Sequence, residues 1–358
     1  MAILERLRRR FHFTSSVVGK GLDVSTGVVV FVALQRVGRE FVLLQAAIKP
    51  IPNEYLKEDR VQEGSHFSNL IQEMIEEFEL PAANVCVATH ANLVAITFAR
   101  LDKEITADVK KAVVKTELKK SVAQPQRDLF YDYFICENEN SEQYKNLQIV
   151  ALRKQDIQTM LEELKSTSFT PSILYVDSYA IIQALALLSP KTPTENQLIV
   201  VIHVEPKAIL LIVLKKGEDL YFERQYIDIE KIEHFLYQLH ASYKTAMKTG
   251  DENLITQMLE TMDPSIAQAK FTLLEKIEDM LTVLYSLKSL QWQFVLSGSG
   301  ALLPGLAEDI EKKLGFPTKV ANPFQSITIN NHLNKQILFQ YAPAFMSACG
   351  LALRGLET

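Results

Sequence analysis

Two apolar runs separated by a short polar turn form the first element that the sequence predicts. Residues 16–36 read SVVGKGLDVSTGVVVFVALQR, and Asp23, Ser25, Thr26 and Gly27 interrupt the apolar residues. Apolar runs of this length, bounded by turn-forming residues, are typical of β-strands. We therefore predict a β-hairpin with a polar tip.

Strand and helix patterns then alternate up to about residue 188. In FSNLIQEMIEEFEL, residues 67–80, apolar residues recur every three or four positions, which predicts an amphipathic helix with one buried face. Further strands are expected near 40–48, 85–89, 93–99, 129–136 and 147–153, and further helices at 106–120, 154–166 and 177–188. This order predicts a first α/β half.

A second half begins after a connector rich in Pro, Ser and Thr at residues 189–196. Residues 198–225 repeat the strand, turn, strand design of the first half, with His203 in the position that Asp23 holds there. Mostly helical sequence follows from 229 to 289. The repetition predicts an internally duplicated, two-lobed α/β architecture.

The second half ends in an unusually bare stretch of backbone. A strand runs into Gly298, Ser299 and Gly300, and helices are predicted at 304–315 and 342–355. Glycine loses much conformational entropy on folding, so this loop should serve either a special backbone angle or close approach of another group.

Composition narrows the classes of function. The chain has 358 residues, 47% of them apolar, a net charge of −5 and a pI near 5.9, as is ordinary for a soluble protein and unsuited to nucleic acid. The longest apolar runs, at 28–34 and 208–214, are far shorter than the roughly 20 residues that span a bilayer.

Cysteines, histidines and the N-terminus add little chemistry. The three cysteines lack CxxC spacing, so we expect reduced core thiols, and the seven histidines form no metal-binding motif. Residues 1–15 form a basic amphipathic leader without a secretory core, so we expect a cytoplasmic chain. The pattern suits an anionic membrane surface or an acidic partner, and the alternative is a solvated leader before the domain starts.

Three elements could meet in a cleft between the halves: the turns at 23–27 and 203–207 and the loop at 298–300. Asp23 could hold Mg²⁺ through water, and Ser25 and Thr26 offer hydroxyls to phosphate oxygens. The free amides around Gly27 suit an anion, and the bare loop Gly298, Ser299 and Gly300 could lie against a nucleoside. Together they predict a nucleotide site, although no Walker or GxGxxG motif is present.

The order of these motifs resembles the actin and sugar-kinase superfamily, and longer segments resemble the PilM family of type IV pilus assembly proteins. The segments that carry this resemblance are GLDVSTGVVVFVAL (21–34), QPQRDLFYDYFI (124–135), PSILYVDSYAIIQAL (171–185), LSGSGALLPGLAEDIEKKLGFPTKVANPF (296–324) and YAPAFMSACGLALRG (341–355). The resemblance covers nearly the whole chain after residue 15.

The resemblance implies an actin-like fold with an inserted FtsA-type 1C subdomain. The implied division is lobe 1 at 16–190 with subdomains 1A and 1C, lobe 2 at 191–340 with 2A and 2B, and a C-terminal helix at 341–358 that returns to lobe 1. It also implies ATP with Mg²⁺ in the interdomain cleft, where Asp23 matches the acid of the first phosphate motif and residues 298–300 match the adenosine motif.

The implied partners are those of a pilus assembly platform. They are the cytoplasmic N-terminal peptide of a PilN-like inner-membrane protein, docked in a groove on the 1A/1C side, and the pilus motor ATPases. The chain would then work in the cytoplasm, at the inner face of the inner membrane.

The phosphate hairpins depart from the family pattern. Ser25 replaces a glycine and Val30 a lysine, while the second hairpin has His203 for the acid and Glu205 for a glycine, followed by Pro206. A carboxylate near a triphosphate adds repulsion of about 1–4 kcal/mol at surface-like dielectric. We therefore expect a scaffold whose ATP binding is weak, structural or absent, rather than an enzyme.

Two other functions remain open from the sequence. One is a small-molecule kinase of the same superfamily, which needs a catalytic base that the second hairpin lacks. The other is an FtsA-like filament-forming ATPase, whose membrane-binding helix would lie at the opposite end of the chain from residues 1–15.

Overall fold

The computed structural model describes most of the chain after the predicted leader. The described residues are 17–25, 27–57, 60–102, 106–122, 125–136, 144–188, 196–215, 218–287 and 290–357. The leader at 1–15, most of the predicted connector and the predicted phosphate contact Thr26 therefore lie outside the described residues.

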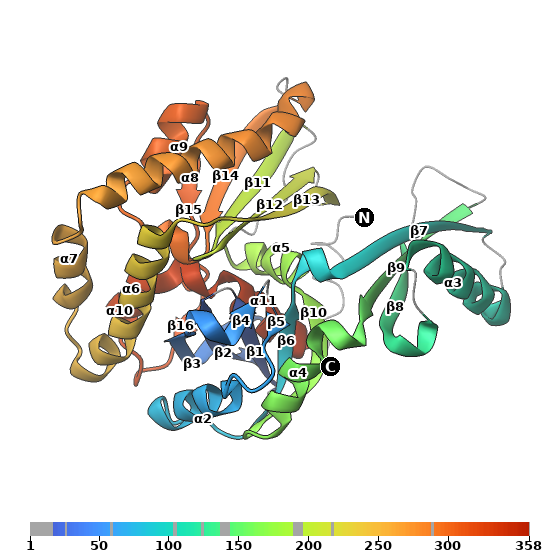
Figure 1. Cartoon of the computed structure of the whole chain (residues 1–358), viewed down its shortest axis with the longest axis horizontal. Coiled ribbons are helices and arrows are strands. Elements are labelled where there is room, and N and C mark those ends of the chain that lie inside the picture. Colours follow the sequence, from blue (N-terminus) through green and yellow to red (C-terminus); the bar gives the residue numbers. More distant parts are fainter. Residues whose placement is uncertain are drawn as a thin grey trace.

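Two large mixed sheets form the body of the protein (Figure 1). The first has the strand order β10-β6-β1-β2-β3-β16, and its strands are β1 (Val18–Ser25), β2 (Val28–Val37), β3 (Glu40–Pro50), β6 (Ala83–Thr89), β10 (Phe169–Val176) and β16 (Thr328–Ile329). The second has the order β13-β12-β11-β14-β15, with β11 (Gln197–Val204), β12 (Ala208–Lys215), β13 (Glu218–Tyr226), β14 (Gln291–Ser297) and β15 (Thr318–Val320). A two-stranded ribbon, β4 (Leu56–Lys57) and β5 (Arg60–Val61), follows β3.

The two sheets share one topology. In each, the first three strands of the lobe form an antiparallel meander, β1-β2-β3 or β11-β12-β13, and the next strand, β6 or β14, pairs in parallel with the first. A fifth strand, β10 or β15, then adds in parallel beyond it. This correspondence confirms the predicted duplication. Near its end the chain crosses back, because β16 pairs with β3 of the first sheet.

Helices cover both sheets and largely match the predicted ranges. They are α2 (Phe67–Glu77), α3 (Ala107–Ser121), α4 (Lys154–Lys165), α5 (Asp177–Leu188), α6 (Glu230–Thr249), α7 (Asn253–Glu260), α8 (Ser265–Leu281), α9 (Leu306–Leu314), α10 (Lys335–Tyr341) and α11 (Met346–Gly355). The predicted start at Pro304 is wrong, because Gly305 has a left-handed φ of 71° as N-cap and the helix begins at Leu306. A 3-10 turn, Ser299–Leu302, precedes it.

A small subdomain is inserted between β6 and α4. Its sheet has the order β7-β9-β8, with β7 (Val94–Asp102), β8 (Leu129–Cys136) and β9 (Tyr144–Arg153). Helix α3 covers one face, where Val114 and Leu118 pack against Leu147 and Ile149. In Figure 1 this subdomain projects from the body of the first lobe.

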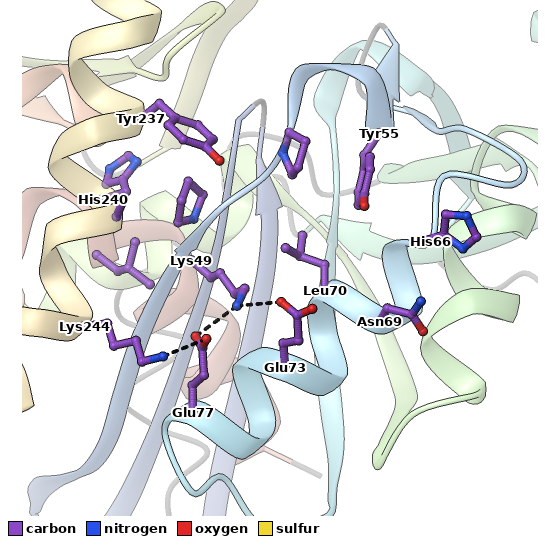
Figure 2. A pocket seen from close by; sticks show the side chains of 14 residues that line it. Lys49, Tyr55, His66, Asn69, Leu70, Glu73, Glu77, Tyr237, His240 and Lys244 are labelled. Carbon is purple, nitrogen blue, oxygen red and sulfur yellow. Dashed lines mark hydrogen bonds and ion pairs between the residues drawn. The ribbon is translucent and has the colours of Figure 1, made fainter.

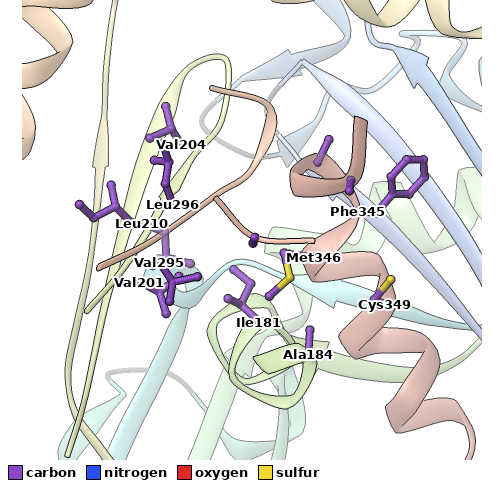
Figure 3. Packing of buried hydrophobic residues seen from close by; sticks show 14 of the residues in the cluster. Ile181, Ala184, Val201, Val204, Leu210, Val295, Leu296, Phe345, Met346 and Cys349 are labelled. Atoms are coloured by element: carbon purple, nitrogen blue, oxygen red, sulfur yellow. The ribbon is translucent and has the colours of Figure 1, made fainter. Parts of the chain in front are cut away.

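The two lobes share a continuous hydrophobic core. Ile181 and Ala184 of α5 and Met346 of α11 pack in the same cluster as Val201 and Leu296 of the second sheet (Figure 3). Burial of apolar surface contributes about 25 cal/mol per Å², so a core common to both lobes opposes their separation. Helices α5 and α11 therefore join the lobes rather than merely cover one of them.

Helix α11 lies unusually close to its neighbours. A Cβ placed on Gly350 would be 1.7 Å from the carbonyl oxygen of Ala180 in α5, and one placed on Gly21 of β1 would be 2.2 Å from that of Ala348. Such distances are available only to residues without a side chain. The glycines thus allow α11 to pack between the first sheet and α5.

The apolar C-terminal region belongs to this core. Among the described residues, Lys335–Gly355 is long and apolar enough to cross a membrane by length and composition, with 83% of its most apolar window buried inside the protein. Cys86 and Cys349 are buried free thiols, as expected from the sequence.

The packing of α11 predicts a severe effect of one methyl group. Replacing Gly by Ala in a helix ordinarily gains about 1 kcal/mol. In Gly350→Ala, however, the new methyl meets backbone that cannot rotate away, so we expect a loss of about 3 kcal/mol or more of unfolding free energy. Chemical denaturation measures it.

The matched control is Gly355→Ala, in the same helix, where the nearest atom to the new methyl is the Lys20 nitrogen at 3.2 Å. We expect it to change stability by at most about 1 kcal/mol. Equal stability of the two variants would contradict the close-packing argument.

Candidate functional site

The tips of the two equivalent hairpins meet at the boundary between the lobes. Gly27, in the turn between β1 and β2, has a left-handed φ of 87°, and a Cβ there would lie 3.1 Å from the Cβ of Pro206. Pro206 lies in the turn between β11 and β12. The structure thus brings two of the predicted turns together, with their own residues in contact.

Asp23 is buried near the end of β1. Its Oδ2 accepts a hydrogen bond of 2.6 Å from the Ser25 hydroxyl, while its Oδ1 is buried without a hydrogen-bond partner. Burial, and then the nearby Glu205 carboxylate, raise the pKa of Asp23 to about 6, although the Ser25 hydrogen bond acts in the opposite direction.

The bare loop after β14 is filled by the second hairpin. A Cβ on Gly298, whose φ is 81°, would lie 2.4 Å from the Val204 carbonyl oxygen, and one on Gly300 would lie 2.2 Å from the Val204 Cγ1. Ser299 between them is buried. These glycines therefore accommodate Val204 of the same chain, and their bareness is explained without a ligand.

Glu205 and Arg224 form a buried ion pair beside these turns. The two Nη atoms of Arg224 donate to the two carboxylate oxygens of Glu205 at 3.0 and 2.6 Å. Burial alone would raise the pKa of Glu205, but the charge and hydrogen bonds of Arg224 hold it well below its usual range. The sequence had marked Glu205 as a departure from the family and had missed Arg224.

Strand register explains how Arg224 reaches this point. His203 of β11 pairs with Leu210 of β12, which in turn pairs with Arg224 of β13, so the three residues form one row across the sheet. The His203 Nδ1 lies 2.9 Å from the Ser297 hydroxyl at the end of β14. Burial lowers the pKa of His203, against the effect of Glu205.

Two residues of the first lobe complete the cluster, and neither was singled out from the sequence. Asp177, the first residue of α5, has its Oδ2 3.6 Å from the Arg224 Nη1. His90, after β6, has Nδ1 3.1 Å from the same oxygen and Nε2 3.0 Å from the Val24 carbonyl oxygen. Asp177 Oδ1 also accepts from the Ala91 amide at 3.0 Å.

The residues at this boundary fit a magnesium triphosphate poorly. The unpartnered Oδ1 of Asp23 is a feature that a hydrated cation would satisfy. Against it, Glu205 is already bound to Arg224 and offers phosphate no donor, Val204 fills the space beside the glycines, and Pro206 has no amide to donate. In the described part of the chain, no group of three or more His, Cys, Asp or Glu could hold a metal.

A second feature at the lobe boundary is a pocket of about 600 Å³, lined by β3 and α2 of the first lobe and by α6 of the second (Figure 2). Lys49 of β3 pairs with Glu77 of α2 at 2.9 Å, and Lys244 of α6 pairs with Glu77 across the lobes at 2.8 Å. Burial opposes ionisation of Glu77, but the two lysines hold its pKa below the usual range. His240 is buried beside them with both ring nitrogens unpartnered, and burial lowers its pKa to about 3.

A second groove, of about 450 Å³, lies between the first sheet and the inserted subdomain. Its walls come from β10, an outer strand of the first sheet, and from β8 and β9, of which β8 is an outer strand of the inserted sheet. Pro171, Ile173 and Leu174 form one wall, with Phe130 and Val150 on the other. The groove is thus mainly apolar and bordered by two sheet edges.

The buried charge of Asp23 predicts a pH dependence of stability. A pKa raised from 3.8 to about 6 on folding means that the folded state binds the proton more tightly. The contribution of protonated Asp23 to the free energy of unfolding is therefore complete below pH 3.8 and is lost as the pH rises through 6. Between pH 4 and pH 7, wild type should therefore lose about 2 kcal/mol of unfolding free energy relative to Asp23→Asn.

Denaturation of both proteins at several pH values measures this difference, and parallel pH profiles would contradict it. Ser25→Ala offers a further check. Removing the hydroxyl that stabilises the ionised form should move the midpoint of the wild-type transition to higher pH.

The comparison with family profiles identifies one family. The profile of the type IV pilus assembly protein PilM family matches residues 21–356. A chain in a solved PilM-PilN type IV pilus biogenesis complex is 19% identical, with a TM-score of 0.68 over 96% of this chain and 99% of that one. The ethanolamine utilization protein EutJ from Carboxydothermus hydrogenoformans is 14% identical, with a TM-score of 0.47 over 98% of this chain and 95% of that chain.

An archaeal actin homolog is 12% identical, with a TM-score of 0.39 over 94% of this chain and 98% of that one. The predicted actin-like α/β fold is confirmed. Because the profile spans nearly all of the described residues, the chain belongs to the type IV pilus assembly protein PilM family.

Proposed function

We propose that this chain is a cytoplasmic scaffold of a type IV pilus assembly platform. In this proposal it works at the inner face of the inner membrane and binds the cytoplasmic N-terminal peptide of a PilN-like membrane protein. Pilus motor ATPases are its further proposed contacts. Membership of the PilM family supports the proposal, and the similar solved complex pairs a PilM with a PilN.

The observation that carries the proposal is the groove between β10 and β8. Both are outer strands of their sheets, so each has one edge without a neighbouring strand in the described structure. An extended peptide can add to such an edge through main-chain hydrogen bonds, and pockets for its side chains then select the sequence. The apolar lining favours a peptide with apolar side chains at alternate positions.

Phe130 is the clearest anchor on the groove wall. Its side chain is 40% exposed, so a bound peptide can cover it, and Lys154 lies over its ring at 5.4 Å. Lys165 at the groove, on α4, and Asp132, on β8, add one charge of each sign. A peptide that covers the ring gains apolar burial that an aspartate there would abolish.

We therefore predict that Phe130→Asp weakens binding of a PilN-like N-terminal peptide by ten-fold or more, because losing about 1.4 kcal/mol costs a factor of ten. Fluorescence anisotropy with a labelled peptide measures the affinity. Phe271→Asp is the matched control, since Phe271 is 50% exposed on α8 in the second lobe. Equal affinity of the Phe130 variant and wild type would reject this groove as the binding site.

We further propose that ATP and Mg²⁺ are bound weakly or not at all at the hairpin tips. The support is the local chemistry, in which Val204 occupies the space beside Gly298 and Gly300, and Pro206 has no amide hydrogen to donate to phosphate. Titration calorimetry with MgATP should give an affinity no tighter than about 1 mM, with no phosphate release. Micromolar binding with turnover, both lost in Asp23→Ala, would contradict it.

A further inference from the structure

Two of the cations described above pair with an acid of the opposite lobe, Arg224 and Lys244, and Arg224 is the more deeply buried of the two. Its side chain is 1% exposed, and it contacts Glu205 of its own lobe and Asp177 of the other. We propose that Arg224 is a resident cation that holds the two lobes closed, so that closure in this chain needs no metal-bound nucleotide. The proposal goes beyond peptide docking and does not depend on the groove.

The contacts of Arg224 run without a break from one lobe to the other. From β13 the guanidinium binds Glu205 through both Nη atoms and approaches Asp177 at the start of α5. Asp177 contacts His90, and His90 contacts the backbone of β1 at Val24. A displacement of the second lobe would therefore have to break the buried ion pair between Arg224 and Asp177, the link in this series that crosses from one lobe to the other.

Charge balance explains why this position needs a cation. Asp23, Asp177 and Glu205 bring carboxyl groups from both lobes to one buried region, each 3% exposed or less. Carboxylates removed from water repel one another strongly unless a cation lies among them. The planar guanidinium suits this task because it binds one carboxylate through two hydrogen bonds and still faces a second.

A second pair across the lobes supplies the comparison. Lys244 of α6 and Glu77 of α2 are 2.8 Å apart, but their side chains are 35% and 27% exposed. Water screens such a pair, so it contributes little. If burial is what makes the Arg224 pair strong, removing Arg224 should destabilise the protein much more than removing Lys244.

The experiment compares Arg224→Gln with Lys244→Gln by thermal unfolding and by hydrogen exchange, each with and without millimolar MgATP. Arg224→Gln removes the cation and leaves its buried carboxylates without a counter-charge, so it should lower the Tm by about 6 to 10 °C. Lys244→Gln breaks an exposed pair and should lower the Tm by about 2 °C or less. Exchange of the amides in the first turn of α5 should accelerate at least ten-fold in Arg224→Gln only. Wild-type exchange there should be unchanged by MgATP.

Two results would overturn the proposal: wild-type behaviour of Arg224→Gln, or slower wild-type exchange at the start of α5 when MgATP is added. If Arg224→Gln does not fold, the double variant Glu205→Met with Arg224→Met takes its place, because it removes the carboxylate together with its cation. In a folded double variant, exchange in the first turn of α5 should still accelerate at least ten-fold, because the pair between Arg224 and Asp177 is gone, and wild-type exchange there would overturn the proposal. A double variant that also fails to fold counts against it.

These results are separable from the proposed function. If wild type does not bind the PilN-like peptide, peptide docking is rejected, but the comparison of Tm between Arg224→Gln and Lys244→Gln is unaffected. Micromolar MgATP binding that leaves exchange at α5 unchanged would reject the proposed loss of nucleotide binding but leave the role of Arg224 in place.

Discussion

The close packing of α11 between the first sheet and α5 is the constraint on which the rest of the structure depends. It is possible only because Gly21 and Gly350 lack side chains where backbone atoms of neighbouring elements approach. With α11 and α5 in this position, their remaining faces pack into the core of the second lobe. The two halves therefore fold around one core and cannot move apart without exposing it to water.

A shared core fixes the distance between the two hairpin tips. Gly27 and Pro206 come into contact, and the acids near them are buried together. Burial without compensation would cost several kcal/mol per charge, so the lobe boundary requires its own counter-charge. Arg224 meets that requirement for Glu205 and Asp177, while Asp23 responds by holding its proton to a higher pH.

The architecture suits a protein that assembles others. The body joins two lobes through a buried core, and the inserted subdomain adds a groove edged by β8 and β10. A groove between two sheet edges on a fixed body would offer the proposed peptide a preformed site, which would reduce the conformational entropy that binding must overcome. The same body leaves little space at the hairpin tips.

The sequence by itself determined the local elements and their repetition. Periodicity located the helix at α2, the two hairpins and the duplication, because these depend on neighbours a few residues apart. Only the tertiary structure decided which residues lie against the glycine loop and the hairpin turns. Gly298 and Gly300 read as room for a nucleoside but hold Val204, and Arg224 meets Asp177 from a distant strand. Contacts between segments so far apart follow from strand register and core packing, which no local pattern encodes.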